Sequence, residues 1–311
     1  AALAPAGASG VLPGFFVGIP GSIGFQVDSG RLTYATIKAN PDPLKSVDVT
    51  RAYTTILAEV RGAALVGIDG IEIEAIRLDF ASSSATGAPP LPIAPLDWTT
   101  RVDLQSTAAT FGADPVVVGT RTIDLTAADA GISISGALKM DIMGFVLAAG
   151  EFEFDQLTAL NASDGLITLA NATGMRLSLS NMHFFVGVGG GFVEDAEGNV
   201  TGLDTDDAIG FSVTGASLDL ISVKEGGGAL RSWTGVAAGI NAMGVHGLPS
   251  AFELEILNLA LRFNGKAADA SKLDWAALAA LPGDAFGLDG TALAQITRAT
   301  DISISGQLYL N

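Results

Sequence analysis

Apolar and polar residues alternate along much of the chain with a period of two, the pattern of a β-strand with one buried face. The clearest run covers residues 132–154, where nearly every even-numbered position is apolar or small. Serine, lysine, aspartate and glutamate fill the odd-numbered positions at both ends of this run. Because one strand of this length would span about 75 Å at ~3.3 Å per residue, we expect a bend near Gly144 or Gly150.

The alternation slips by one residue at two places. One slip falls at Ala75 and Ile76, and the other falls at Ile256 and Leu257. A slip of one residue turns every following side chain to the opposite face unless a bulge absorbs it. Both segments are therefore predicted to contain a built-in bulge or to cross between two sheets.

Short motifs from the first half of the chain return in the second half. The matching segments are residues 15–19 with 184–188, 23–27 with 209–213, 96–98 with 273–275, and 132–136 with 302–306. Such self-similarity is the signature of a tandem repeat. We interpret residues 1–22 as the tail of a preceding unit, residues 23–208 as a complete β-repeat unit and residues 209–311 as a truncated second unit.

Turn residues such as Asp69-Gly70 and Asn264-Gly265 separate the alternating runs, as hairpins require. One short helix is expected at residues 270–281, with Asp269 or Ser271 as its cap, and residues 97–104 are its weaker counterpart. The sequence thus predicts an all-β fold made of an elongated tandem β-repeat. The units are either β-solenoid-like or stacked β-sandwiches, with long antiparallel strands and a short helix per unit.

Composition excludes several classes of protein. The net charge is −17, and 16 basic residues among 33 acidic ones cannot form the basic face that nucleic acid binding needs. No run approaches the ~20 apolar residues that span a bilayer, so no membrane span is expected. The chain has no cysteine, which excludes disulfides, thiolate metal sites and cysteine nucleophiles.

The best candidate for a ligand site is the acidic loop at residues 194–207. It offers alternating oxygen donors and a carboxylate at the twelfth place, a spacing that resembles a calcium-binding loop. The candidate ligands are Asp195, Glu197, Asn199, Thr201 and Asp206. Val200 stands where such a loop needs glycine, so the competing interpretation is a hairpin that turns at residues 197–199 with a solvated acidic tip.

No catalytic constellation stands out in the sequence. The glycine-rich segment 187–192 has Phe192 in place of the third glycine of a nucleotide-binding loop, and no helix is predicted after it. The two histidines, His183 and His246, lie in apolar β segments without the context of a hydrolytic triad. The chain is therefore predicted not to be an enzyme and to use no cofactor, apart from the calcium ion considered above.

The alternating strands and glycine turns at residues 62–73, 132–138 and 302–306 resemble the degenerate β-repeats of giant bacterial surface and adhesin-like proteins. The resemblance implies export to the cell surface or the extracellular space and an elongated multi-repeat shape. It also implies a role in adhesion or in an extracellular filament.

Three functional hypotheses follow. The leading one is a non-enzymatic structural segment that acts as a rigid spacer or a fibre building block, with adjacent repeats or other copies as partners. The second is an adhesin-type module that recognises a glycan or a surface through acidic loops, with calcium as a possible aid. The third is a lipid-binding β-groove, suggested by one fully apolar strand face, although Gly136, Ala148 and Gly150 on that face favour close protein packing.

Overall fold

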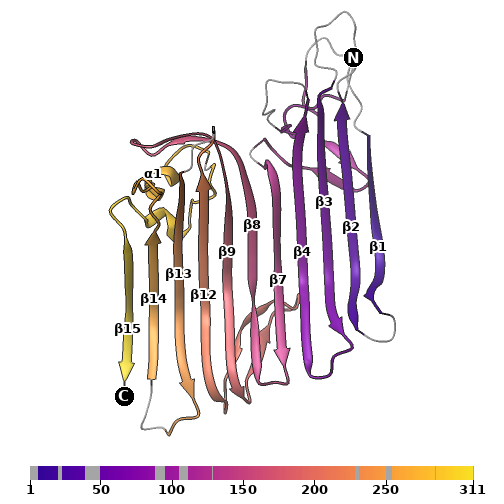
Figure 1. The fold of residues 1–311 in the computed structure, drawn as a ribbon. Helices are drawn as coiled ribbons and strands as arrows, with labels where there is room; N and C mark the ends of the chain where they lie inside the picture. The colour runs from indigo at the N-terminus through magenta and orange to yellow at the C-terminus, as the bar shows by residue number, and fades with distance from the viewer. Residues whose placement is uncertain are drawn as a thin grey trace, which may run out of the picture.

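The computed structural model describes residues 6–19, 23–38, 50–87, 95–104, 111–127, 129–227, 231–249, 254–283 and 285–310. Its main feature is one antiparallel sheet of eleven strands (Figure 1). The strands follow one another along the chain, in the order β1-β2-β3-β4-β7-β8-β9-β12-β13-β14-β15. The all-β prediction and the prediction of long antiparallel strands are confirmed.

The strands of the large sheet contain 9 to 21 residues each. They are β1 (Ala6–Gly18), β2 (Gly24–Lys38), β3 (Ala52–Val66), β4 (Ile71–Thr86), β7 (Gly131–Ile142), β8 (Val146–Ser163), β9 (Thr168–Val188), β12 (Ile209–Lys224), β13 (Ser232–His246), β14 (Leu254–Asn264) and β15 (Ile302–Leu310). Two separate hairpins pair β5 (Val116–Val118) with β6 (Arg121–Ile123), and β10 (Gly191–Glu194) with β11 (Val200–Asp204). The helical elements are α1 (Trp275–Ala279) and the 3-10 helix η1 (Ala292–Gln295).

The predicted arrangement of the strands needs correction. Stacked sandwiches divide their strands between two layers, and a solenoid winds its strands into stacked coils. Here the eleven strands hydrogen-bond side by side as one antiparallel layer. The long-range pairing of strands decides between these arrangements, and alternation along a single strand carries no information about it.

The prediction of one helix per unit is also wrong for the part of the chain that the structure describes. There α1 is the one α-helix, and it is shorter than residues 270–281 because its cap is Asp274, which accepts a hydrogen bond from the Ala277 amide at 3.0 Å. In the first copy, Asp97 accepts from the amides of Thr99 and Thr100, and the segment stays a turn. No helix among the described residues has the length and apolar character needed to cross a bilayer.

The hydrogen-bond register of the sheet repeats. Phe15 lies opposite Val27 in the β1·β2 pair, and the matching Phe184 lies opposite Val213 in the β9·β12 pair. The correspondence continues strand by strand, so that β1-β2-β3-β4-β7 is matched by β9-β12-β13-β14-β15. The two sets stand side by side in one sheet. The unit boundaries after residues 22 and 208 stay a prediction.

Both predicted bulges are confirmed. The β4·β7 register shifts between Ala75 and Arg77, and the β14·β15 register shifts between Leu257 and Ala260. In each pair the extra residue lies on the first strand, whereas β7 and β15 alternate without interruption. The bulge therefore absorbs the slip, and the apolar residues before and after it stay on the same face.

Further inserted residues continue this feature across the sheet. Gly62, Asn181, Gly215 and Asn258 interrupt the ladders of β3, β9, β12 and β14, and all four have a positive φ between 50° and 62°. Glycine and asparagine tolerate this left-handed conformation better than other residues. Because of these inserted residues, the apolar side chains of each interrupted strand stay on the same face as those of the uninterrupted strands.

The sheet consequently has two faces of opposite character. Directly paired residues share a face, and so do alternate residues along a regular strand. The face that we name the covered face carries charged and small polar residues across its middle, among them Arg61, Asp79, Arg77, Glu151, Glu153, Arg176, Asp219 and Arg262. The opposite face, which we name the apolar face, carries Leu78, Phe80, Ile134, Phe152, Phe154, Leu177, Leu179, Leu218, Leu220, Leu261 and Ile304.

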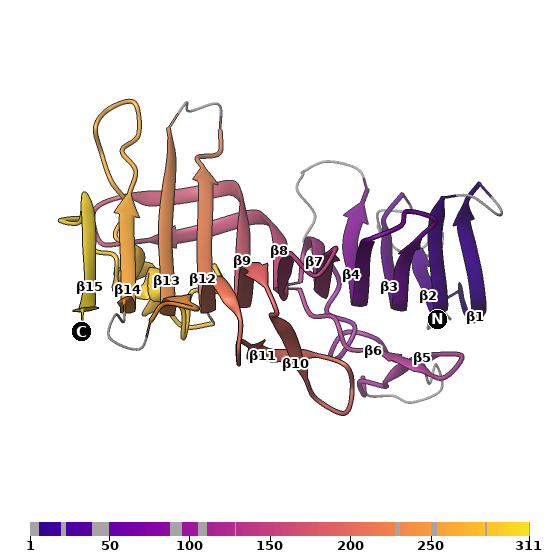
Figure 2. The same cartoon turned by 90° about the horizontal axis from the view of Figure 1, so that it is seen from below.

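The small elements pack on the covered face. Trp98, Val116 and Ile123 form a buried cluster with Ala35 and Leu57 of β2 and β3. The α1 segment forms the largest buried cluster, in which Trp275 and Leu278 meet Ile221, Val223 and Trp233 of β12 and β13. Figure 2 shows the β5–β6 and β10–β11 hairpins on the same side of the sheet.

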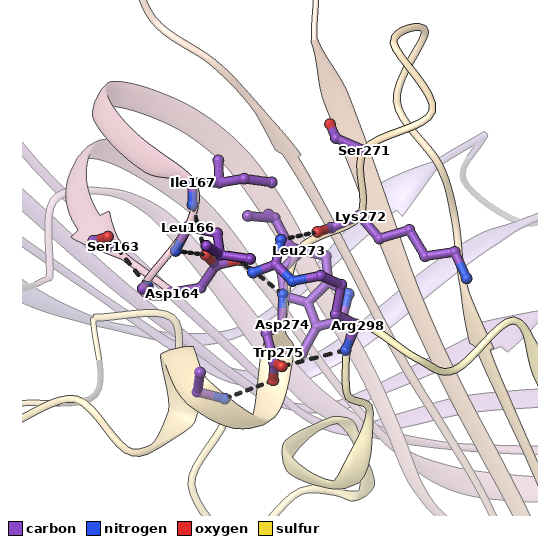
Figure 3. Close-up of polar contacts among 12 residues, drawn as sticks. Ser163, Asp164, Leu166, Ile167, Ser271, Lys272, Leu273, Asp274, Trp275 and Arg298 are labelled. Atoms are coloured by element: carbon purple, nitrogen blue, oxygen red, sulfur yellow. Dashed lines mark hydrogen bonds and ion pairs between the residues drawn. The ribbon is translucent and has the colours of Figure 1, made fainter.

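A buried polar network fixes the α1 segment to the tip of the β8–β9 hairpin (Figure 3). The Asp164 side chain is fully buried and accepts hydrogen bonds from the amides of Leu166, Ile167 and Asp274 at 2.8–3.0 Å. Arg298 pairs with the same carboxylate at 2.7 Å. Burial opposes ionisation of Asp164, but the three amides and Arg298 outweigh it and hold the pKa of Asp164 below its ordinary value.

Candidate functional site

The β10–β11 hairpin lies on the covered face. Phe192 and Leu203 of the hairpin pack on a buried cluster that contains Leu147 and Phe185 of the sheet. Beside this contact, Lys139 of β7 bridges Glu74 and Glu194 at 3.0 and 3.1 Å. Burial disfavours the charge of Lys139, yet the two carboxylates outweigh it and raise its pKa. An apolar contact and an ion-pair bridge thus hold the hairpin on the sheet.

A polar cleft of about 340 Å³ lies between this hairpin and the sheet. Arg77 pairs with Glu151 at 2.6 Å, and the Asn181 side chain donates to the other oxygen of Glu151 at 3.1 Å. The polar side chains that line the cleft are Arg77, Glu151, Asn181, His183, Asp195, Asn199 and Thr201. The mixture of donors and acceptors suits a small polar ligand, and glycan recognition stays a prediction for it.

The structure brings some of the predicted calcium ligands together and separates others. Asp195 and Asn199 lie in the turn of the β10–β11 hairpin, as the competing hairpin interpretation predicted. Asp195 Oδ1 accepts hydrogen bonds from the amides of Glu197 and Asn199 at 3.0 and 2.8 Å, and the Asn199 side chain donates to both carboxylate oxygens. The carboxylate of Asp195 therefore closes the turn. These hydrogen bonds, chiefly those from Asn199, lower the pKa of Asp195.

Two of the remaining predicted ligands, Thr201 and Asp206, lie outside this turn. The Thr201 hydroxyl donates to the carbonyl oxygen of Val193 across the hairpin at 3.1 Å. Asp206 lies beyond the end of β11, and its amide donates to Asp204 at 3.1 Å. Among the described residues, no group of three or more acidic or histidine side chains is placed to hold a metal ion. The five-ligand calcium site stays a prediction without a formed coordination sphere.

We expect calcium to leave the melting temperature of the chain unchanged, because the Asp195 carboxylate is engaged by its own turn. An ion present at a hundredfold excess over its dissociation constant would add ~2.7 kcal/mol of stability. Thermal melts in calcium, in magnesium and in chelator test this expectation. A calcium-specific rise of several degrees that chelator reverses would contradict it and support the predicted site.

The two histidines have different surroundings. His183 is buried in the floor of the polar cleft, and burial lowers its pKa. His246 Nε2 lies 2.7 Å from the Ser212 hydroxyl, a contact that sequence reasoning missed because it depends on the pairing of β12 with β13. No carboxylate hydrogen bond to His246 is present in the described part of the chain. The Ser212–His246 pair thus lacks the third member of a hydrolytic triad.

The apolar face of the sheet carries two hollows among its exposed and half-buried side chains. They lie along β7, β8 and β9 and have volumes of about 480 and 460 Å³. The first is lined by Ile73, Leu138, Met140, Ala148, Gly150, Phe152, Leu177, Leu179 and Met182. Lys139 and Glu151 also border it, but their charged ends pair with Glu194 and Arg77 on the covered face. Exposed apolar surfaces of this kind mark interaction sites.

The small residues on this face have a different role from the one predicted. A Cβ atom at Gly136 would lie 2.8 Å from the side chains of both Leu78 and Phe152, and one at Gly150 would collide with Met182. Neighbours within the same sheet therefore fill the space above both glycines. Close packing of another protein layer on this face stays a prediction.

Comparison of the chain with protein-family models, with curated proteins and with solved structures finds no match.

Proposed function

We propose that this chain is a non-enzymatic structural segment of a secreted bacterial surface or filament protein, in which repeated groups of strands join edge to edge into one extended sheet. The observation that carries the proposal is the repeated register. β1-β2-β3-β4-β7 and β9-β12-β13-β14-β15 pair alike, and they meet within a continuous hydrogen-bonded sheet. Repeats that meet in this way enlarge the sheet sideways instead of forming separate domains.

The edge at β15 supports the same proposal. β15 corresponds to β7, and in the first set the second edge of β7 pairs with β8 along residues 133–142. In the described structure β15 pairs only with β14, and all of its residues are exposed. Unpaired strand edges recruit further strands. The matching edge of β15 is therefore suited to a strand of the β8 type.

We expect the chain to self-associate through this edge in a concentration-dependent way. Ser305→Lys should abolish the association, because a lysine on the edge strand would lose its water when a new strand pairs beside it. Thr168→Lys is a matched control, since it adds the same charge at the exposed tip of the β8–β9 hairpin. Sedimentation velocity over a range of concentrations is the measurement.

Two results would contradict the edge proposal. One is a wild-type chain that stays monomeric at every concentration. The other is association that Ser305→Lys and Thr168→Lys leave equally intact, which would place the contact away from β15. Far-UV circular dichroism of both variants verifies that the sheet is retained.

A further inference from the structure

The two edge strands of the sheet, β1 and β15, differ in how well their sequences protect them from pairing. Proteins commonly blunt an edge strand with proline or with charged residues. Residues 302–310 of β15 contain neither, and all of them are exposed. The other edge strand, β1, contains Pro13, which has no amide hydrogen to donate to a further strand. The β15 edge is therefore the better suited of the two to a partner strand.

The pairing of β7 with β8 shows which strand fits beside β15. Residues 132–136 and 302–306 have the same sequence, and β7 and β15 occupy matching places in the two sets of strands. In the antiparallel β7·β8 pair, Gly136 lies opposite Phe152. The same register places Gly306 opposite an aromatic residue of the incoming strand.

The surroundings of Gly306 leave room for such a residue. A Cβ atom on Gly136 would lie 2.8 Å from the ring of Phe152, so the ring occupies the space that a side chain would need there. The three atoms nearest to a Cβ on Gly306 belong instead to Leu257 and Leu259 of β14, at 3.2 Å or more. The side of Gly306 toward the open edge thus offers the space that the Phe152 ring fills beside Gly136.

We propose that the β15 edge binds an extended segment of another polypeptide, which runs antiparallel to β15 and inserts an aromatic side chain beside Gly306. The segment has the alternation of residues 146–157, with its aromatic residues on the apolar face. In a folded copy of the chain β8 is already paired on both edges, so the donor is a free segment of this type. Main-chain hydrogen bonds supply the affinity, and the aromatic side chain fixes the register.

Titration of the full chain with a fluorescent peptide that has the sequence of residues 146–157 tests the proposal by anisotropy. The peptide should bind saturably with one-to-one stoichiometry. Gly306→Ala should weaken binding at least about fivefold, because the added methyl group overlaps the aromatic ring. Gly10→Ala on the β1 edge is the matched control, since a Cβ there meets no atom within 4 Å among the described residues. A peptide with Phe152→Ala should bind the wild type and the Gly306→Ala variant equally.

Disulfide coupling tests the register and the face. The chain has no cysteine, so Ser305→Cys introduces a single thiol. Ser305 matches Ser135, which lies opposite Glu153 in the β7·β8 pair. A peptide with Glu153→Cys should therefore couple to the Ser305→Cys chain. A peptide with Phe154→Cys should couple much less, because adjacent residues of a strand point to opposite faces.

The proposal is overturned if the peptide does not bind, or if Gly306→Ala and Gly10→Ala weaken its binding equally. It is also overturned if the two cysteine peptides couple to the chain equally. The inference rests on the edge-to-edge assembly proposed above, but the two fail in different ways. A chain that self-associates and does not bind the peptide retains the assembly and excludes this partner. A chain that stays monomeric and binds the peptide retains the partner and excludes the self-association.

Discussion

Replacing Asp164 with alanine is expected to lower the free energy of unfolding by about 3–5 kcal/mol, the usual cost of breaking a buried charge pair. The substitution leaves Arg298 without its carboxylate partner and three backbone amides without an acceptor. Urea denaturation followed by circular dichroism measures the loss. Asp79→Ala is the control, because the exposed pair of Asp79 with Arg61 should contribute no more than ~1 kcal/mol.

The contribution of Asp164 should also depend on pH. Its pKa in the folded chain lies below the ordinary value of 3.8, so the unfolded chain binds more protons in the interval between the two values. The stabilisation is fully present above 3.8 and disappears as the pH falls through the folded pKa. The difference in stability between wild type and Asp164→Ala should therefore shrink in acid. A difference that stays constant down to low pH would contradict this account.

The two repeated tryptophans, Trp98 and Trp275, are equally buried but differ in the hydrogen bonding of their indole N–H groups. Trp275 Nε1 donates to Asn264 Oδ1 at 3.1 Å, whereas Trp98 Nε1 has no partner among the described residues. We expect Trp275→Phe to destabilise the chain by about 1–3 kcal/mol more than Trp98→Phe, because only the former leaves a buried acceptor unsatisfied. Truncation of either residue to alanine should cost about 3–5 kcal/mol through the cavity that it creates.

The cause of this difference lies on the two strands above each tryptophan. Thr55 pairs with Ser83 in the first set, and Gly235 pairs with Asn264 at the matching place in the second. Asn264 reaches Trp275 as well as the carbonyl oxygens of Leu273 and Thr297. Thr55 and Ser83 are shorter, and within the described part of the chain their buried hydroxyls lack hydrogen-bond partners, as Trp98 Nε1 does.

Equal destabilisation by Trp98→Phe and Trp275→Phe in urea denaturation would show that the hydrogen bond to Asn264 contributes nothing. Asn264→Ser is the complementary variant, because it places in β14 the serine that β4 has at the matching position, Ser83. It should remove most of the difference between the two tryptophan variants.

Much of the local structure follows from the sequence. Uninterrupted alternation in residues 132–142 predicted β7, and the slips near Ala75 and Ile256 predicted bulges, because side-chain parity in a strand is set by neighbouring residues alone. The hairpin turn at residues 197–199 was likewise predictable from its turn residues. These features depend on a few residues that are close together in the chain.

The arrangement in space did not follow from the sequence. A single layer and a sandwich use the same alternating strands, so the pattern could not show that the strands form one layer. The role of the buried Asp164 carboxylate could not be predicted either, since it accepts a hydrogen bond from an amide 110 residues away. Ser212 and His246 meet only because of the β12·β13 register. Such contacts depend on pairing over long sequence distances.

The strand order places the Trp98 and Trp275 segments at a regular distance from each other across the sheet. Six steps across the sheet separate β4 from β14, the strands that precede the two tryptophan-bearing segments. At ~4.8 Å per strand, this corresponds to a lateral period of about 29 Å. Because six is even, both segments emerge at the same end of the sheet, and both fold onto the same face. An assembly that continues this pattern would display its protrusions as a straight, evenly spaced row, while its other side stays smooth.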